Sequence, residues 1–507
     1  MKLSKKLKKM PRGFGAEGVF RKVLHLIAVF FGKVVDSIRM MPKYEKYLTL
    51  LLFIVALTLS VIKAREVYIE KTNLVSTEGG IYTEAVVGEL KSINPVYSQS
   101  DADKAVSELL FSGLVKIEKN KILADLAESW EISSGDLVYT FHLRKNVLFH
   151  DGSTLTANDV AYTIDQIKQK TDVNTRSPLF SAWENVVVNV LDDYTITFEL
   201  PKPYGPFLYS CDFGVIPSYL LPDQFSKEFI GTGPYINESI KNNGGKISEI
   251  KLKSNAAYFG QKSKISAINL LYFENDSEAV KVVNNGKADS LFAADISKEG
   301  ITDYSYNSGK QLGLMFNLRN DRFKDKEFRR KIISGEKMPD ATKIRLVTLT
   351  PPIQKAKAEE LKTRFAVQNI ELELIYLNVV QLQDVLSTKE FEILLYGFDF
   401  SRDRDPYSFW HSSQIDANNF AGYSDKKSDI LLEDARMLTD EAARNTKYDQ
   451  FFNTIATEYI AEFYAPIKYF FHVSSNIKSI PAILGAEPGS RYFGIDQWYI
   501  KEKRVKK

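Results

Sequence analysis

Histidine and carboxylate side chains are the residue types from which this chain of 507 residues could build a catalytic or metal site. His150 and Asp151 are adjacent, and an imidazole oriented by a carboxylate is the core of a proton shuttle. Adjacent residues on an extended segment point to opposite faces, however, which argues against that pairing. The five histidines are dispersed, and no His-x-x-x-His or Cys-x-x-Cys spacing occurs. We therefore predict that the protein is not an enzyme and holds neither a metal nor a cofactor.

The densest polar cluster is DFSRDRD, at residues 399–405. It follows an apolar segment, and Tyr407, Phe409 and Trp410 come directly after it. Alternating charges on a loop often form a solvated ladder of ion pairs. Charges at the end of a strand and beside aromatic side chains fit the rim of a ligand cleft better. We therefore predict that this cluster contacts a ligand.

Helices and strands must position these residues. The stretch around the adjacent His150 and Asp151 gives one example of the elements that the sequence predicts. Apolar and polar residues alternate from Leu137 to Leu143, which predicts a half-buried strand. Asp151 and Gly152 favour a turn, and Thr156 with Asp159 has the spacing of a capping box at the start of a helix. The stretch is therefore expected to form a strand, a turn, a further extended run and a helix.

Comparable patterns along the rest of the chain predict an α/β fold, because strands and helices interleave over more than 400 residues. The expected strands are Gly80–Val87, Val186–Val190, Tyr194–Leu200, Ile247–Leu252, Ile268–Phe273, Ile344–Leu349, Ile370–Leu377 and Ile393–Tyr396. The expected helices are Ala102–Phe111, Glu278–Asn285, Ile353–Phe365, Ser428–Leu438 and Ala442–Ile460.

Charge and hydropathy at the N-terminus predict a membrane anchor. Residues 1–46 sum to +9 and the rest of the chain to −6, and the uncharged run Leu48–Ile62 is just long enough to cross a bilayer. The positive-inside rule places residues 1–46 in the cytoplasm, a transmembrane signal anchor at 47–64 and the remainder outside the cell, on the periplasmic side. A cleaved signal peptide is disfavoured because its charged region is normally a few residues long. A buried core helix is disfavoured because the segment is apolar on every side.

Within the basic arm, apolar residues recur at helical spacing from Phe20 to Ile38. This pattern predicts an amphipathic helix along the inner leaflet. The alternatives are a helix that packs on a partner protein and a second, weakly hydrophobic span. Because the net positive charge lies in the arm and the rest of the chain is net acidic, we expect no binding of nucleic acid.

The segment LADLAESWEISSGDLVYTFHLRKNVLFHDGSTLTANDVAYTI, residues 123–164, resembles the signature of the family 5 extracellular solute-binding proteins. These are the oligopeptide, dipeptide and nickel receptors of ABC importers. Further blocks follow in the family's order, and the resemblance covers residues 78–480. The blocks are SINPVYSQSDADKAVSELLFSGLV, DDYTITFELPKPYGPFL, IGTGPY, NNGKADSLF, DPYSFWHSS and AGYSDKKSDILLEDA.

The resemblance implies a periplasmic-binding-protein-like fold of the class II type, with two lobes that are joined by two crossing strands and close around a ligand. Lobe 1 would comprise residues 76–112, 190–300 and 475–507, with an extra subdomain at 113–189. Lobe 2 would comprise residues 301–474. The strand, turn and helix near His150 would belong to the extra subdomain and brace the cleft wall.

The resemblance also places the ligand contacts. In lobe 1 they fall on Gln99, Ser100 and Asp101, and in the extra subdomain on Leu179. The run that follows the lobe 2 strand adds Phe398, Asp399, Phe400, Ser401, Arg402, Asp403 and Trp410.

Two departures from the family pattern affect lobe 2. The acidic residue that holds a peptide α-amine in the family aligns here with Ser401 or Arg402, depending on the direction of counting. After FKDKEFRRKII the chain crosses in SGEKMPDAT directly to KIRLVTLT, where the family continues for several tens of residues. We therefore expect a shortened lobe 2 and a more open pocket.

These observations predict a monomeric, membrane-anchored extracellular solute-binding protein that captures peptides or a similar polar solute for ABC permease subunits. The alternative is a surface sensor or scaffold that keeps the fold without transport, with the cytoplasmic arm as its transmitting part. A hydrolase that uses Asp399, Asp403 or Asp405 as acid and base is disfavoured, because these carboxylates form no recognisable catalytic pair.

Overall fold

The structure of the protein is a computed structural model. It describes residues 40–98, 100–118, 121–169, 179–220, 229–292, 300–400, 403–482 and 485–507, together with Val29, Lys33, Ser37 and Ser177. The chain divides into two compact units. Unit 1 is Met1–Val75 with Glu502–Lys507, and unit 2 is Ser76–Lys501.

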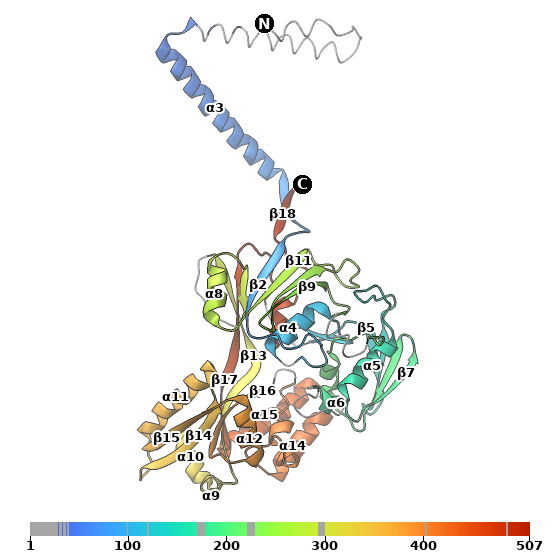
Figure 1. The fold of residues 1–507 in the computed structure, drawn as a ribbon, viewed down its shortest axis with the longest axis vertical. Helices are drawn as coiled ribbons and strands as arrows, with labels where there is room; N and C mark the ends of the chain where they lie inside the picture. The colour runs from blue at the N-terminus through green and yellow to red at the C-terminus, as the bar shows by residue number, and fades with distance from the viewer. Residues whose placement is uncertain are drawn as a thin grey trace. The chain divides into compact units, whose positions relative to one another are not determined.

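In unit 1, the helix α3 (Lys43–Glu70) contains the predicted anchor and buries none of its residues. Its length and composition suffice to cross a membrane. The strand β1 (Thr72–Thr77) follows α3 and pairs with β18 (Lys501–Lys506) in a two-stranded sheet (Figure 1). The predicted amphipathic helix at residues 20–38 lies outside the described residues, apart from three isolated positions.

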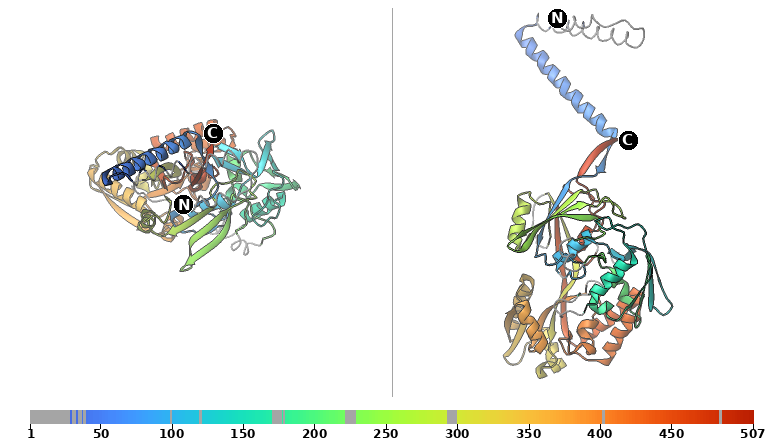
Figure 2. Two further views of the ribbon diagram at one scale, coloured as in Figure 1. Left: turned by 90° about the horizontal axis from the view of Figure 1, so that it is seen from above. Right: turned by 45° about the vertical axis from the view of Figure 1, so that its right-hand side comes forward.

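A ten-stranded sheet runs through unit 2 in the order β15-β14-β16-β13-β17-β12-β2-β11-β10-β9. Two neighbouring strands in this order, β13 and β17, are antiparallel and continue from one half of the sheet into the other (Figures 1 and 2). They are the crossing strands that the predicted two-lobe α/β fold requires. The strands are β2 (Ile81–Val87), β9 (Tyr235–Asn243), β10 (Lys246–Ser254), β11 (Ala267–Phe273), β12 (Ser290–Phe292), β13 (Ile301–Phe316), β14 (Thr342–Leu349), β15 (Ile370–Leu377), β16 (Ile393–Asp399) and β17 (Ala461–Ser474).

A second, four-stranded antiparallel sheet has the order β5-β6-β8-β7. The strand that was predicted from the alternation at Leu137–Leu143 is β6, and its residues Tyr139, Phe141 and Leu143 are buried. The predicted capping box forms, since Thr156 and Asp159 pair reciprocally at the start of α5. The sheet and its neighbours are β5 (Ala127–Ile132), β6 (Val138–Leu143), β7 (Val187–Asp192), β8 (Thr195–Glu199), the hairpin β3 (Val115–Glu118) and β4 (Lys121–Ala124), α5 (Ala157–Ile167), α6 (Phe180–Trp183) and η2 (Gly205–Cys211).

The predicted helices are confirmed as α4, α8, α11, α14 and α15, with ends that differ by a few residues. After α10 the chain reaches β14 directly, through a turn in which Gly335 adopts a left-handed conformation (φ 80°). The remaining elements of unit 2 are α4 (Asp101–Leu110), α8 (Asp276–Asn284), α9 (Asp321–Lys324), α10 (Lys326–Ser334), α11 (Pro352–Val367), α12 (Val379–Thr388), α13 (Tyr407–Trp410), η3 (Ser412–Gln414), α14 (Lys426–Met437), α15 (Glu441–Thr457) and η4 (Pro488–Tyr492).

A fully buried ion pair fixes the segment around η4 against β2. The Arg491 guanidinium donates to Oε1 of Glu84 from Nε (3.0 Å) and Nη2 (2.7 Å), and both side chains are 0% exposed. The hydroxyls of Tyr82 and Tyr492 also donate to this carboxylate, at 2.6 and 2.9 Å. Four charge-assisted hydrogen bonds therefore offset the cost of removing the two charges from water.

We expect Arg491→Met to lower the free energy of unfolding by about 3–5 kcal/mol, because Glu84 would stay buried without its cation. The double variant Glu84→Gln/Arg491→Met should lose much less of its free energy of unfolding, because it leaves no buried charge unpaired. Urea denaturation of residues 76–501 measures both, and we expect this unit to fold when produced alone because it contains all four apolar cores. The control is Lys241→Met, which removes a surface ion pair because this lysine is 63% exposed. It should lower the free energy of unfolding by at most about 1 kcal/mol. Equal losses in Arg491→Met and the control would contradict this role for the buried pair.

Candidate ligand-binding cavity

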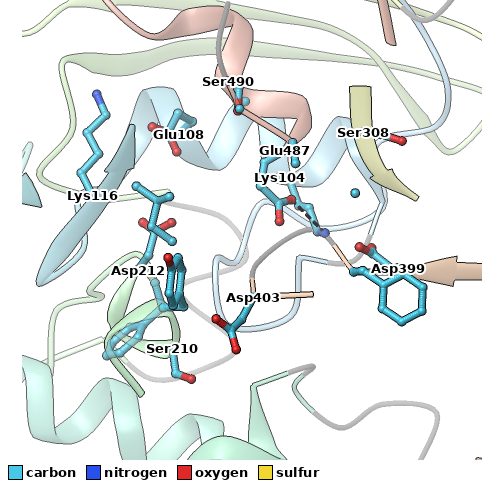
Figure 3. Close-up of a pocket in the computed structure, with 18 of the residues that line it drawn as sticks. Lys104, Glu108, Lys116, Ser210, Asp212, Ser308, Asp399, Asp403, Glu487 and Ser490 are labelled. Atoms are coloured by element: carbon cyan, nitrogen blue, oxygen red, sulfur yellow. Dashed lines mark hydrogen bonds and ion pairs between the residues drawn. The ribbon is translucent and has the colours of Figure 1, made fainter. Parts of the chain in front are cut away.

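A cavity of about 1260 Å³ lies within unit 2. Its walls come from the polar face of α4, from η2, from the middle of β13 and β17, from the segment after β16 and from residues 485–495 (Figure 3). These segments are far apart in the sequence, so the fold alone brings them together.

The backbone ladder of the two crossing strands is interrupted where they line the cavity. The pairing of β13 with β17 shifts register between Asn307 and Gln311 and again before Gly313. Pro466 lies opposite Gln311 and has no N–H to donate. The Ser308 hydroxyl instead donates to the carbonyl of Ile467 (2.7 Å). Interruptions of this kind are frequent beside ligand sites, because they leave backbone groups outside the sheet.

On one wall, carboxylates outnumber cations. Glu108, Asp125 and Asp212 surround Lys116, and Figure 3 shows Glu108, Lys116 and Asp212 near one another. Burial raises the pKa of Glu108 to about 7, against the opposing charge of Lys116. Burial likewise raises the pKa of Asp125 to about 6. This wall therefore changes its protonation near neutral pH.

On the opposite wall, arginines from α14 and α15 neutralise the acidic side chains. Asp403 accepts hydrogen bonds from Nη2 (2.6 Å) and Nε (2.8 Å) of Arg444. Burial raises the pKa of Asp403 to about 6, although Arg444 opposes the shift. Asp405 accepts from Nε of Arg436 (2.7 Å), whose guanidinium lies 3.7 Å from the centre of the Tyr407 ring.

Comparison with known proteins identifies the fold. Residues 121–332 match the family described as bacterial extracellular solute-binding proteins, family 5, middle region. The match spans less than half of the chain, and it shows that this region resembles the family. It is 22% identical over 519 residues to the oligopeptide-binding protein AppA of Bacillus subtilis (strain 168), covering 83% of this chain and 92% of that protein. The dipeptide-binding protein of Escherichia coli (strain K12) is 30% identical over 215 residues, which cover 36% of this chain and 38% of that protein.

Solved structures of other proteins show the same fold as this chain. The structure of AppA from Bacillus subtilis in complex with a nonapeptide has a TM-score of 0.67 at 20% identity and covers 84% of this chain and all of its own. NikZ from Campylobacter jejuni, in complex with Ni(L-His), has a TM-score of 0.67 at 24% identity and covers 83% of this chain and 99% of its own.

Four of the predicted contact residues line the cavity together. They are Leu179, Asp399, Phe400 and Asp403. The backbone N–H of Phe400 also donates to the carbonyl of Gly309 (2.8 Å), which joins the segment after β16 to the interrupted part of β13.

Four other predicted contact residues lie outside the cavity lining. Ser100 caps α4 by accepting from the N–H of Asp103 (3.0 Å), and Asp101 forms an ion pair with Nζ of Lys310 (2.5 Å). The rings of Phe398 and Trp410 are 1% and 0% exposed and stack at 6.0 Å in the apolar core beneath the wall.

The remaining predicted contacts, Gln99, Ser401 and Arg402, lie outside the described residues.

Several charged residues of the cavity were missed by the sequence analysis. Lys104 and Glu108 lie on the polar face of α4, opposite the buried Ala105 and Leu109, so the amphipathic pattern of this helix was an available signal. Lys104 forms an ion pair with Glu487 at 3.2 Å. Glu487 comes from the C-terminal segment, and no local pattern connects that segment with α4.

A pH-dependent stability is expected from Glu108. Its raised pKa stabilises the folded state below its ordinary value of 4.5, and this contribution is lost as the pH rises toward about 7. Glu108→Gln should therefore increase the free energy of unfolding at pH 8, by on the order of 1 kcal/mol, and reduce the difference between pH 5 and pH 8. Urea denaturation at both pH values provides the measurement. Glu128→Gln, at an exposed position of β5, should leave the pH profile unchanged. Identical profiles for both variants would refute this electrostatic account of the wall.

Proposed function

We propose that this solute-binding protein captures a peptide, or a polar solute of similar size, for an ABC importer and is not an enzyme. The observation that carries the proposal is a cavity of about 1260 Å³ between the two sides of a fold shared with an oligopeptide receptor. Pockets for single drug-sized ligands span about 300–1,000 Å³, so this cavity suits a longer ligand. Its relatives are named for binding oligopeptides and dipeptides, which supports a peptide.

The interrupted crossing strands suit a ligand with a peptide backbone. A buried peptide must find partners for its N–H and carbonyl groups, or lose several kcal/mol. Backbone groups of β13 near Ser308 and the segment after Asp399 line the cavity and can extend the sheet to a bound strand. We propose that Asp399 and Asp403, at the end of β16 and after it, contact the ligand. Leu179, at the start of α6, is the third proposed contact. Ser100, Asp101, Phe398 and Trp410 would support the contacting residues from behind.

Direct contacts between the two sides of the cavity support closure around the ligand. The Tyr209 hydroxyl donates to Glu441 (3.1 Å), which joins η2 to α15. The Thr439 hydroxyl donates to Asp136 (3.4 Å), which joins the α14–α15 connection to the turn between β5 and β6. Gly205 lies so close to this connection that a Cβ atom would be 1.7 Å from the carbonyl oxygen of Leu438. The crossing strands would act as the hinge.

We propose the following organisation for the whole chain. Residues 1–46 lie in the cytoplasm, 47–64 cross the membrane and the solute-binding part lies outside the cell as a monomer that delivers its ligand to permease subunits. Lobe 1 (76–112, 190–300 and 475–507) carries the extra subdomain (113–189), and lobe 2 (301–474) is the shortened one. The length and hydropathy of α3 support the anchor.

Peptide binding is tested on purified residues 76–501. Native mass spectrometry should find a bound small molecule, and peptides of graded length should raise the melting temperature, since a ligand at 100 times its Kd stabilises by about 2.7 kcal/mol. Ser107→Trp, which fills the cavity from α4, should abolish the shift, and Ser277→Trp on the exposed start of α8 should preserve it. Empty protein that no peptide stabilises would refute the proposal and favour the sensor or scaffold.

Closure is tested with Gly205→Ala. The added methyl group would overlap Leu438, so we expect the lobes to separate, a larger radius of gyration by X-ray scattering and a peptide affinity reduced at least about tenfold, or ~1.4 kcal/mol. Gly397→Ala is the matched control, because the nearest atom to its Cβ would be Leu312 Cδ2 at 4.0 Å. Unchanged scattering and affinity in Gly205→Ala would show that this contact does not close the cavity.

A further inference from the structure

Five cations gather in unit 1 at the C-terminal end of α3. Lys71 directly follows α3, and the other four cations lie on β18 or directly after it. We call these five residues the basic ribbon: Lys71, Lys503, Arg504, Lys506 and Lys507. The backbone N–H of Lys507 donates to the carbonyl of Lys71 (3.0 Å). These residues are therefore held next to the last turn of the helix, although more than 430 positions separate Lys71 from the others in the sequence.

The charge of the basic ribbon is not balanced within the described part of the protein. None of its five side chains forms an ion pair with a described acidic residue, although Lys63 and Glu66, one turn earlier, do pair. All four lysines are exposed. Arg504 donates to the hydroxyl of Thr72 (3.2 Å), and its guanidinium lies 6.0 Å from the centre of the Tyr68 ring. Glu70 and Glu502 adjoin the ribbon in the sequence, but its five cations outnumber them, and such an excess of like charge favours an anionic partner.

The length of α3 places this charge at the level of lipid headgroups. A span of about 20 residues centred on the apolar run Leu48–Ile62 would end near Arg65, and Lys71 follows about 9 Å further along the helix. That distance is comparable with the depth of the headgroup region, about 5–8 Å, and with a Debye length of about 8 Å. Tyr68, 54% exposed, lies between these points, where aromatic side chains are enriched at membrane interfaces.

A two-stranded sheet is marginally stable by itself, and among the described strands β1 and β18 pair with each other and with no third strand. We propose that the basic ribbon binds anionic phospholipid headgroups of the leaflet from which α3 emerges, and that this contact orders the β1–β18 sheet. The inference rests on the proposed membrane anchor. Phospholipid is favoured over a soluble polyanion because the helix end holds the ribbon permanently at the bilayer surface.

The test uses the full chain in lipid nanodiscs of phosphatidylcholine, with or without about 30% phosphatidylglycerol. Hydrogen exchange of the β1 and β18 amides should be at least tenfold slower with the anionic lipid, and 0.5 M NaCl should remove the difference. The triple variant Lys503→Gln/Lys506→Gln/Lys507→Gln should lose the lipid dependence. The same triple change to Arg should retain it.

Lys202→Gln/Lys253→Gln/Lys287→Gln removes three exposed lysines of unit 2 and should retain the lipid dependence. Equal exchange in both lipids would overturn the inference, and so would equal protection by soluble polyphosphate added to phosphatidylcholine discs. Alkaline extraction of cell membranes tests the anchor separately. A chain that resists extraction but shows no lipid dependence refutes the ribbon contact alone, whereas an extracted chain refutes the anchor.

Discussion

The antiparallel pairing of β13 with β17 is the interaction on which the rest of unit 2 depends. Both strands belong to the ten-stranded sheet and continue through both of its halves, so their hydrogen bonds join the two sides of the cavity. The same pairing cannot be uninterrupted, because Pro466 lacks a donor and the register shifts around Gln311. The sheet is thus continuous across both halves, yet it leaves polar backbone groups outside the ladder where the two strands line the cavity.

The two walls of the cavity treat buried charge in different ways. Around Asp403 and Asp405, arginines of α14 and α15 supply geometrically matched cations, so the negative charge is satisfied within the protein. Around Glu108 and Asp125, a single lysine faces three carboxylates, and burial raises both pKa values toward neutrality. Burial raises the pKa of Asp403 as well, so the two walls differ in their cations: the first pairs each carboxylate with an arginine, whereas the second has one lysine for several carboxylates.

Much of the secondary structure could be predicted from the sequence, because it depends on neighbouring residues. Thr156 and Asp159 cap α5 as their spacing predicts, and the alternating apolar residues of β6 are buried as expected. The long strands β13 and β17 and the strand β18 were not predicted. Their residues follow no clear alternation, since β13 passes from an exposed face into a fully buried one along its length. What makes these segments strands is the partner strand, which lies far away in the sequence.

The candidate site, too, has features that follow from local sequence and features that depend on distant segments. The sequence alone determined that residues 399–405 end a buried strand with charges beside aromatic side chains, and that α4 has a polar face, because both features are local patterns of side-chain chemistry. Only the tertiary structure decided that Asp403 is bound to Arg444, that Trp410 is buried and that Glu487 meets Lys104 beside the cavity. Each of these outcomes depends on which distant segment supplies the neighbouring atom, and burial and ion pairing follow from that choice of neighbour.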